Sequence, residues 1–195
     1  MKRQLGLLMV MLLLTAGCSL SADNNPQAAE ATTEVIATLG SASSMSSAMT
    51  TYVDKQSSIA FDYPTGWAMI EPPPNDAVIY SYTISSFAPN SGTGSESILP
   101  AGQTKMDVTF FGKDETLDSA QQSLQADVDS GFAVIGKQET RTAADGSPVY
   151  YYAIQGRLGG AAQVVYTSVK GRVVTVTAYG DGAHFEDVVK SLRGA

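Results

Sequence analysis

The stretch VYYYAIQGRLGGAAQVVYTSVKGRVVTVTAYG, residues 149–180, consists of three runs rich in valine, threonine and tyrosine. These residue types favour the pleated, half-buried surface of a β-sheet. Only Gly159-Gly160 and Lys170-Gly171 separate the runs, and both pairs have the chemistry of tight turns. A fourth run, FAVIGKQETRT (132–142), precedes them across AADGSP (143–148). Residues 132–180 are therefore predicted to form a four-stranded antiparallel meander.

Three shorter runs with the two-residue alternation of half-buried strands precede the meander. They are SSIAFDYPTGW (57–67), with Ile59, Phe61 and Tyr63 on one face; AVIYSYTISSF (77–87), with Val78, Tyr80, Tyr82 and Ile84 on one face; and KMDVTFFG (105–112). Pro64 ends the first run and Gly66 turns it, so WAMIE (67–71) is predicted to return beside it as in a hairpin.

Two segments change to the helical period. In residues 116–130, an apolar face is made by Leu117, Ala120, Leu124 and Val128, with Thr116 as the predicted N-cap and Gly131 closing the far end. In residues 181–194, an apolar face is made by Phe185, Val188, Val189 and Leu192, with Asp181 as the candidate N-cap. The order of elements predicts an α+β fold, a twisted antiparallel β-sheet flanked by helices.

With FDYPTGW (61–67) near its start and FEDVVKSLR (185–193) at its end, this domain resembles the PsbP-like superfamily. That group includes photosystem II extrinsic proteins, a Ran-binding yeast protein and LpqN-type bacterial lipoproteins. The resemblance covers roughly residues 52–193 and implies that Gly66 makes a turn, Trp67 fills the core, and Phe185 and Leu192 seat the final helix. It also implies a binding or assembly module, not an enzyme, although the members differ too much to carry one function over.

Residues 1–17 are predicted to be a lipoprotein signal peptide. A basic start, Met1-Lys2-Arg3, precedes an apolar run that is too short for the roughly 20 residues needed to cross a bilayer. The following stretch, residues 14–18 (LTAGC), resembles the bacterial lipobox. The resemblance implies that Cys18 becomes the mature N-terminus and carries a diacylglyceryl group on its sulfur, because a thiolate is the nucleophile that takes this lipid. The alternatives are a buried core thiol or an intermolecular disulfide.

Residues 18–51 are rich in Ser, Thr, Ala and Asn and contain no aromatic side chain, which is typical of a flexible tether. A glycosylated stalk or a partner-binding segment is the alternative. Residues 52–195 are predicted to form the folded domain. Removal of residues 1–17 leaves 10 basic against 19 acidic residues, a formal charge of −9, which excludes the basic footprint expected of a nucleic-acid-binding protein.

No catalytic, metal-binding or cofactor motif is recognisable in the sequence. His184 is the only histidine, and Asp187, three residues on, is the acid predicted to lie beside it on a helix. One neighbouring acid falls short of a ligand set. The paired carboxylates, Asp114-Glu115 and Asp127/Asp129, are best interpreted as solvated surface charge.

Three other residues are candidates for binding a partner. Ile98 and Leu99 are apolar in a polar loop, where they either fold back on the domain or form an exposed anchor. Tyr151 is the middle of three tyrosines; Tyr150 and Tyr152 are predicted to face the core with Ile154 and Leu158, which leaves Tyr151 half exposed.

The sequence therefore predicts an exported, non-enzymatic lipoprotein on the outer face of the cell membrane, or on the outer membrane of a two-membrane source. Its predicted partners are the membrane, through the lipid on Cys18, and an envelope protein or small ligand that the sequence does not identify. No cofactor is expected. The alternative is an envelope hydrolase with an unrecognised carboxylate site.

Overall fold

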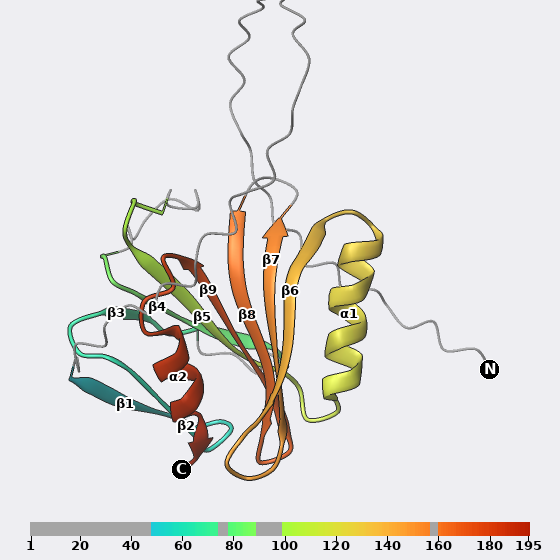
Figure 1. Cartoon of the computed structure of the whole chain (residues 1–195). Coiled ribbons are helices and arrows are strands. Elements are labelled where there is room, and N and C mark those ends of the chain that lie inside the picture. The colour runs from blue at the N-terminus through green and yellow to red at the C-terminus, as the bar shows by residue number, and fades with distance from the viewer. Residues whose placement is uncertain (1–47, 74–77, 89–98, 157–159) are drawn as a thin grey trace, which may run out of the picture. The chain divides into compact units, whose positions relative to one another are not determined.

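The computed structural model describes residues 48–73, 78–88, 99–156 and 160–195, which all lie in the compact unit spanning Ala42–Ala195 (Figure 1). Within these residues the helices are α1 (Leu117–Asp129) and α2 (Phe185–Ser191). The strands are β1 (Met49–Asp54), β2 (Ile59–Pro64), β3 (Ala68–Ile70), β4 (Tyr80–Ser85), β5 (Thr104–Phe110), β6 (Ala133–Thr142), β7 (Pro148–Gly156), β8 (Gly160–Val169), β9 (Arg172–Gly180) and β10 (Arg193–Gly194).

The strands form two antiparallel sheets. The large sheet has seven strands in the order β3-β4-β5-β9-β8-β7-β6, and the small sheet has three in the order β1-β2-β10. The predicted meander is confirmed as β6 to β9, each strand beside the next. Its β8–β9 turn is made by Lys170 and Gly171, which both have positive φ, at 53° and 73°. This geometry matches the twist of the strands that the turn connects.

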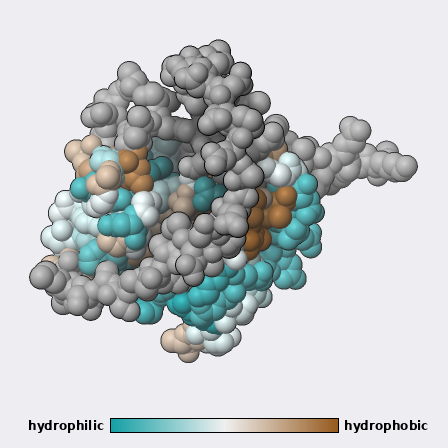
Figure 2. All heavy atoms as spheres, turned by 45° about the horizontal axis from the view of Figure 1, so that its top comes forward, coloured by the Kyte–Doolittle hydropathy of each residue, from teal (hydrophilic) through white to brown (hydrophobic). Residues whose placement is uncertain are grey.

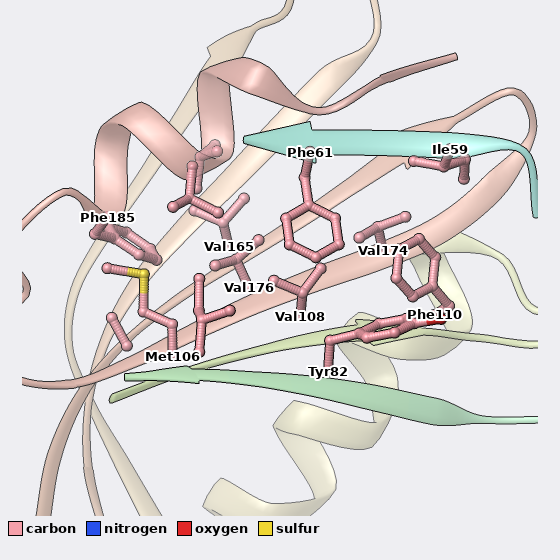
Figure 3. Close-up of a cluster of buried hydrophobic side chains, with 14 of the residues drawn as sticks. Ile59, Phe61, Tyr82, Met106, Val108, Phe110, Val165, Val174, Val176 and Phe185 are labelled. Atoms are coloured by element: carbon pink, nitrogen blue, oxygen red, sulfur yellow. The ribbon is translucent and has the colours of Figure 1, made fainter. Parts of the chain in front are cut away.

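Both faces of the large sheet are covered. On one face, the small sheet and α2 enclose a core in which Phe61 of β2 points between Val108 and Phe110 (Figure 3). On the other face, α1 packs across β6 and β8 and buries Ala120 and Leu124. The two helices thus lie on opposite faces of one antiparallel sheet, and the predicted sheet-dominated α+β class is confirmed (Figure 1).

The N-terminal boundary of the domain differs from the prediction. Strand β1 begins at Met49, within the range 18–51 that the composition assigned to the tether, because Met49, Thr50 and Thr51 pair with β2. Threonine suits a strand as well as a linker, so composition alone did not separate the two. Residues 1–47, including Cys18, lie outside the described part of the chain.

The predicted hairpin of WAMIE with the first strand is wrong. The turn at Gly66, with φ at 91°, is present, but β3 then pairs with β4, Ala68 lying opposite Ser85. The chain therefore crosses from the small sheet to the large one at this turn. Trp67 is partly buried against the core. Nothing local in the sequence distinguishes these two pairings of a three-residue strand.

Two further local predictions are wrong, and one is confirmed. Val78 is 69% exposed, since β4 begins only at Tyr80. The N-cap of α2 is His184, with φ at 62°, while the Asp181 carboxylate accepts hydrogen bonds from Thr104 Oγ1 and from the Ala183 amide. The predicted Thr116 cap of α1 is confirmed, with Ser119 completing a reciprocal capping box.

A buried carboxylate joins the two sheets. Asp54, at the end of β1, is only 1% exposed. Its oxygens accept hydrogen bonds from the Ser57 amide (2.7 Å) and hydroxyl, and from two phenols of β4, Tyr80 (2.7 Å) and Tyr82 (2.8 Å). Burial raises the pKa of Asp54, but the hydrogen bonds from Ser57, Tyr80 and Tyr82 outweigh burial and lower it below the ordinary value.

The two phenols have raised pKa values and therefore stay protonated, as donors to Asp54, at neutral pH. Burial and the adjacent Asp54 carboxylate raise the pKa of Tyr80 to about 12. Burial, Tyr52 and Asp54 also raise the pKa of Tyr82. The Tyr80 ring stacks on Phe110, with ring centroids 5.4 Å apart, so the same side chain serves the carboxylate and the apolar core.

Helix α2 closes the core at the C-terminal end of the chain. Phe185, Val188 and Val189 are buried, and Leu192 is partly buried, which confirms the apolar face predicted for this segment. The helix is also fixed to β2 through polar contacts, because the Asp62 amide donates to Ser191 Oγ at 2.7 Å. Arg193 then pairs with the Asp62 carboxylate at 2.9 Å.

Replacement of Asp54 by asparagine tests the link between the sheets. We expect Asp54→Asn to lower the free energy of unfolding by about 2–4 kcal/mol at pH 7, because an amide cannot accept all of these donors. The folded pKa of Asp54 lies below its unfolded value, so its contribution is complete above pH ~4 and is lost as the pH falls through the folded pKa. Urea unfolding between pH 2 and 7 should therefore show a shallower acid slope for the variant, whereas the exposed Asp114→Asn should behave as wild type. An unchanged slope would show that Asp54 is not the titrating group.

Truncation of Phe185 tests the seating of α2. Phe185 is 2% exposed, so Phe185→Ala should cost about 3–5 kcal/mol of stability. The matched control is Lys190→Ala on the same helix, where the side chain is 71% exposed and the change should stay within about 0.5 kcal/mol. Thermal and urea melts of both variants measure the difference, and equal effects would contradict the packing described.

Candidate functional site

A groove opens between α1 and the outermost strand of the large sheet. Its volume is about 390 Å³. The floor is apolar, and the rim carries amide groups and one carboxylate. The lining residues are Asp118, Gln121, Gln122, Leu124 and Gln125 of α1, Ile135 and Gln138 of β6, and Tyr152 of β7.

A β-bulge in β6 builds one wall of this groove. Ile135 and Gln138 are three residues apart, so a regular strand would place their side chains on opposite faces. The register with β7 shifts between Ile135 and Lys137, and as a result Ile135 lies opposite Ile154 and Gln138 opposite Tyr152. Ile154 and Tyr152 are two residues apart and share a face. The extra residue, Gly136, thus turns both β6 side chains toward α1.

The amide groups around the groove are only partly used by the protein. Gln121 Nε2 donates to the Tyr152 hydroxyl at 2.6 Å, and Gln125 Nε2 donates to Asp129 at 2.8 Å. Gln122 and Gln138 are exposed, and within the described part of the chain their amides make no side-chain hydrogen bond. Each free amide can both donate and accept. The groove therefore offers polar groups of both kinds above an apolar floor.

The charge of the groove is negative. Asp118 is the charged residue among its lining side chains, and α1 as a whole contains Asp118, Asp127 and Asp129 but no Lys or Arg. A single rim carboxylate does not supply the acid and base that hydrolysis by paired carboxylates requires. Among the described residues no group of three His, Cys, Asp or Glu side chains could hold a metal ion. The arrangement suits binding of a neutral or basic group.

The structure places Tyr151 outside this groove. Its ring lies on the face of the main core, at right angles to Phe185 with centroids 6.4 Å apart. The Arg141 guanidinium stacks over the ring at 3.9 Å, and the hydroxyl is 3.5 Å from Glu186. Arg141 also pairs with Glu186 at 2.9 Å. Tyr151 is thus half-buried beneath an ion pair, which makes it a link between β7 and α2.

The predicted positions of Tyr151 and Tyr152 on the two faces of β7 are therefore partly wrong. Tyr152 is buried, but beneath α1 and beside the groove, whereas Tyr151 packs against the main core. The alternation of the tyrosines was correct, but no sequence signal indicated that helices would cover both faces of this strand. Leu158 lies outside the described residues.

The other predicted residues are not brought together with the groove. Leu99 is partly buried and lies close to Gly180, since a Cβ added to Gly180 would be 2.7 Å from Leu99 Cδ2. Of the two alternatives for Leu99, the structure thus shows the one in which it folds back on the domain. Ile98 and Cys18 lie outside the described residues. His184 is beside Asp187, as predicted, with Nδ1 and Oδ2 3.0 Å apart, and its ring meets Trp67 edge-on.

Comparison with known proteins gives likenesses to solved structures alone. No family profile and no curated protein matches the chain. Among solved structures, the chain is similar to cyanobacterial PsbP (CyanoP) from Synechocystis sp., with 17% identity and a TM-score of 0.48 over 80% of this chain and 99% of that one. It is also similar to a Pseudomonas aeruginosa protein of unknown function, with 16% identity and a TM-score of 0.40 over 73% of this chain and 91% of that one. Both likenesses concern the fold alone, and no function or site residue is carried over from either protein.

Proposed function

We propose that this protein is a lipid-anchored module of the cell envelope that binds or helps to assemble a protein or small ligand and catalyses no reaction. The observation that carries the proposal is the open, amide-rimmed groove between α1 and β6. It has an apolar floor and unused hydrogen-bonding groups, the combination that gives a binding site affinity and orientation.

The anchoring part of the proposal rests on the sequence. Residues 14–18 (LTAGC) follow a short apolar segment and resemble a lipobox. Neither helix in the described residues is long and apolar enough to cross a membrane. Two or more acyl chains at Cys18 would make attachment stable without a spanning helix.

The carboxylates considered for the hydrolase alternative have other partners. Asp54 is fully engaged by its four donors, and Asp62 is held by Arg193. The two carboxylate pairs considered from the sequence lie on or beside α1 at the surface, where Glu115 accepts from Ser119 and Asp129 from Gln125. None of these acids faces a second one across the groove. We therefore favour binding.

The lipid on Cys18 can be tested directly. We expect mass spectrometry of the exported protein to find Cys18 as its N-terminus, with a diacylglyceryl group on the sulfur. Cys18→Ser removes the nucleophile, so this variant should leave the membrane fraction or accumulate with residues 1–17 uncut. Detergent phase partitioning compares the two. An unmodified Cys18 thiol in the exported protein would refute the anchor.

Binding can be tested by crosslinking the anchored protein in native membranes and identifying what it captures. The matched control carries residues 1–47 on an unrelated soluble domain, so that capture by the anchor and tether is subtracted. We expect the same protein or ligand in repeated experiments with the native chain only. Capture of no specific partner would contradict the proposed function.

A further inference from the structure

Strand β6 is an edge strand that runs along the groove. It is the last strand of the large sheet and pairs only with β7 among the described residues. Its outer side therefore presents backbone N–H and C=O groups over the ten residues Ala133–Thr142. An extended segment of another chain can pair with such an edge and continue the sheet.

The bulge connects this edge to the groove. Ile135 and Gln138 of β6 both line it. In a strand added beside β6, every second side chain would lie next to these two residues and would enter the space beneath the outer flank of α1. Backbone pairing would then supply affinity, and the groove would select the side chains. The edge and the groove thus form one continuous surface, which we call the β6 channel: strand β6 with the eight groove-lining residues.

The charges near the β6 channel indicate which kind of partner segment it can bind. On the groove side, α1 contributes Asp118, and the helix carries no basic residue. On the opposite side of β6, Lys137, Glu139 and Arg141 alternate and neutralise one another, with Lys137 3.5 Å and Arg141 2.7 Å from Glu139. A bulge together with charged side chains on an edge strand disfavours unselective sheet-to-sheet pairing. This pattern favours a basic partner segment over a second copy of the acidic chain.

Exposed apolar side chains mark one end of the β6 channel. Phe132, directly before β6, and Val134, near its start, are 55% and 63% exposed. Figure 2 shows that brown, hydrophobic patches are few on a largely hydrophilic surface. A segment that covered these side chains would bind more tightly, because burial of apolar surface is favourable.

We propose that the β6 channel binds an extended, basic peptide segment of a partner protein, which adds to β6 as a further strand and directs alternate side chains into the groove. The proposal rests on the binding function proposed above and names the chemistry of the partner. Lysine or arginine in the segment pairs with Asp118, and short polar or apolar side chains meet the amides and the floor.

The first experiment measures binding of fluorescent probe peptides to the full lipidated chain in detergent micelles. The probes are an eight-residue peptide that alternates valine with lysine or threonine, and the same peptide with glutamate for lysine. We expect the lysine peptide to bind at least tenfold more tightly. Asp118→Lys should weaken its binding about three- to tenfold, whereas Asp114→Lys, the same charge change outside the groove, should have little effect. Equal affinity for both peptides, or equal effects of both variants, would overturn the proposal.

The second experiment tests strand addition itself. Two versions of the lysine peptide carry N-methyl groups on alternate amides, one version on the odd and the other on the even positions. Only one set of amides can face β6 in a strand. We therefore expect one version to lose binding and the other to retain it, with hydrogen-exchange protection confined to residues 133–142. Equal binding of both versions would exclude strand pairing.

The third experiment tests the bulge and separates this inference from the proposed function. Deletion of Gly136 should turn Ile135 away from α1 and weaken peptide binding at least fivefold, while thermal melting confirms that the domain remains folded. Replacement of Gln138 by lysine provides a second groove variant that does not change strand length. Chitotetraose serves as a glycan probe. If the protein binds chitotetraose but not the peptide, the proposal is overturned in favour of a glycan site. Capture of the same envelope partner by native and Asp118→Lys chains would refute the peptide site while leaving the binding function intact.

Discussion

A charge can be buried without a cation only when donors surround it, and Asp54 meets that condition. Its carboxylate, 1% exposed, accepts from Ser57 in the β1–β2 connection and from Tyr80 and Tyr82 on β4. Asp54 thereby joins the small sheet to strand β4 of the large sheet. The same two side chains belong to the aromatic core, because the rings of Tyr80 and Tyr82 both lie against Phe110. Strand β2, which carries Phe61, is held over the same core.

The two faces of the large sheet have different roles: one forms the main core, and the other carries the groove. The face that carries Val108, Val176 and Val165 is closed by β2 and α2 and contributes stability. Among the described residues, the other face is covered by α1 alone, and its margin at β6 carries the groove. Side chains alternate between the two faces along each strand. Tyr151 therefore packs in the main core and Tyr152 beside the groove, although they are adjacent in sequence.

Features that depend on neighbouring residues were accessible from the sequence. The turns and the strand pattern predicted the meander, and the residue type of Thr116 predicted the N-cap of α1. The helical spacing of apolar residues predicted the buried face of α2. Features that depend on distant contacts were not: the partner of β3, the start of β1, the four donors of Asp54, and the groove itself. One available signal for the groove was Gly136 within a run of strand formers, since a glycine in a strand often marks a bulge. Interpreting it required the register with β7, which the sequence does not specify.

Both ends of the described domain belong to the small sheet, and this arrangement determines how it responds to tension. Strands β1 and β10 flank β2, with Met49 opposite Pro64 at one end and Gly194 opposite Ile59 at the other. A pull applied between the two ends of the domain acts on β1 and β10 from opposite ends of β2. It therefore loads their hydrogen bonds with β2 in shear, so that whole strands must slide before the pairing is lost. Asp54, at the end of β1 farthest from Met49, also accepts hydrogen bonds from Tyr80 and Tyr82 of β4, and these resist the sliding.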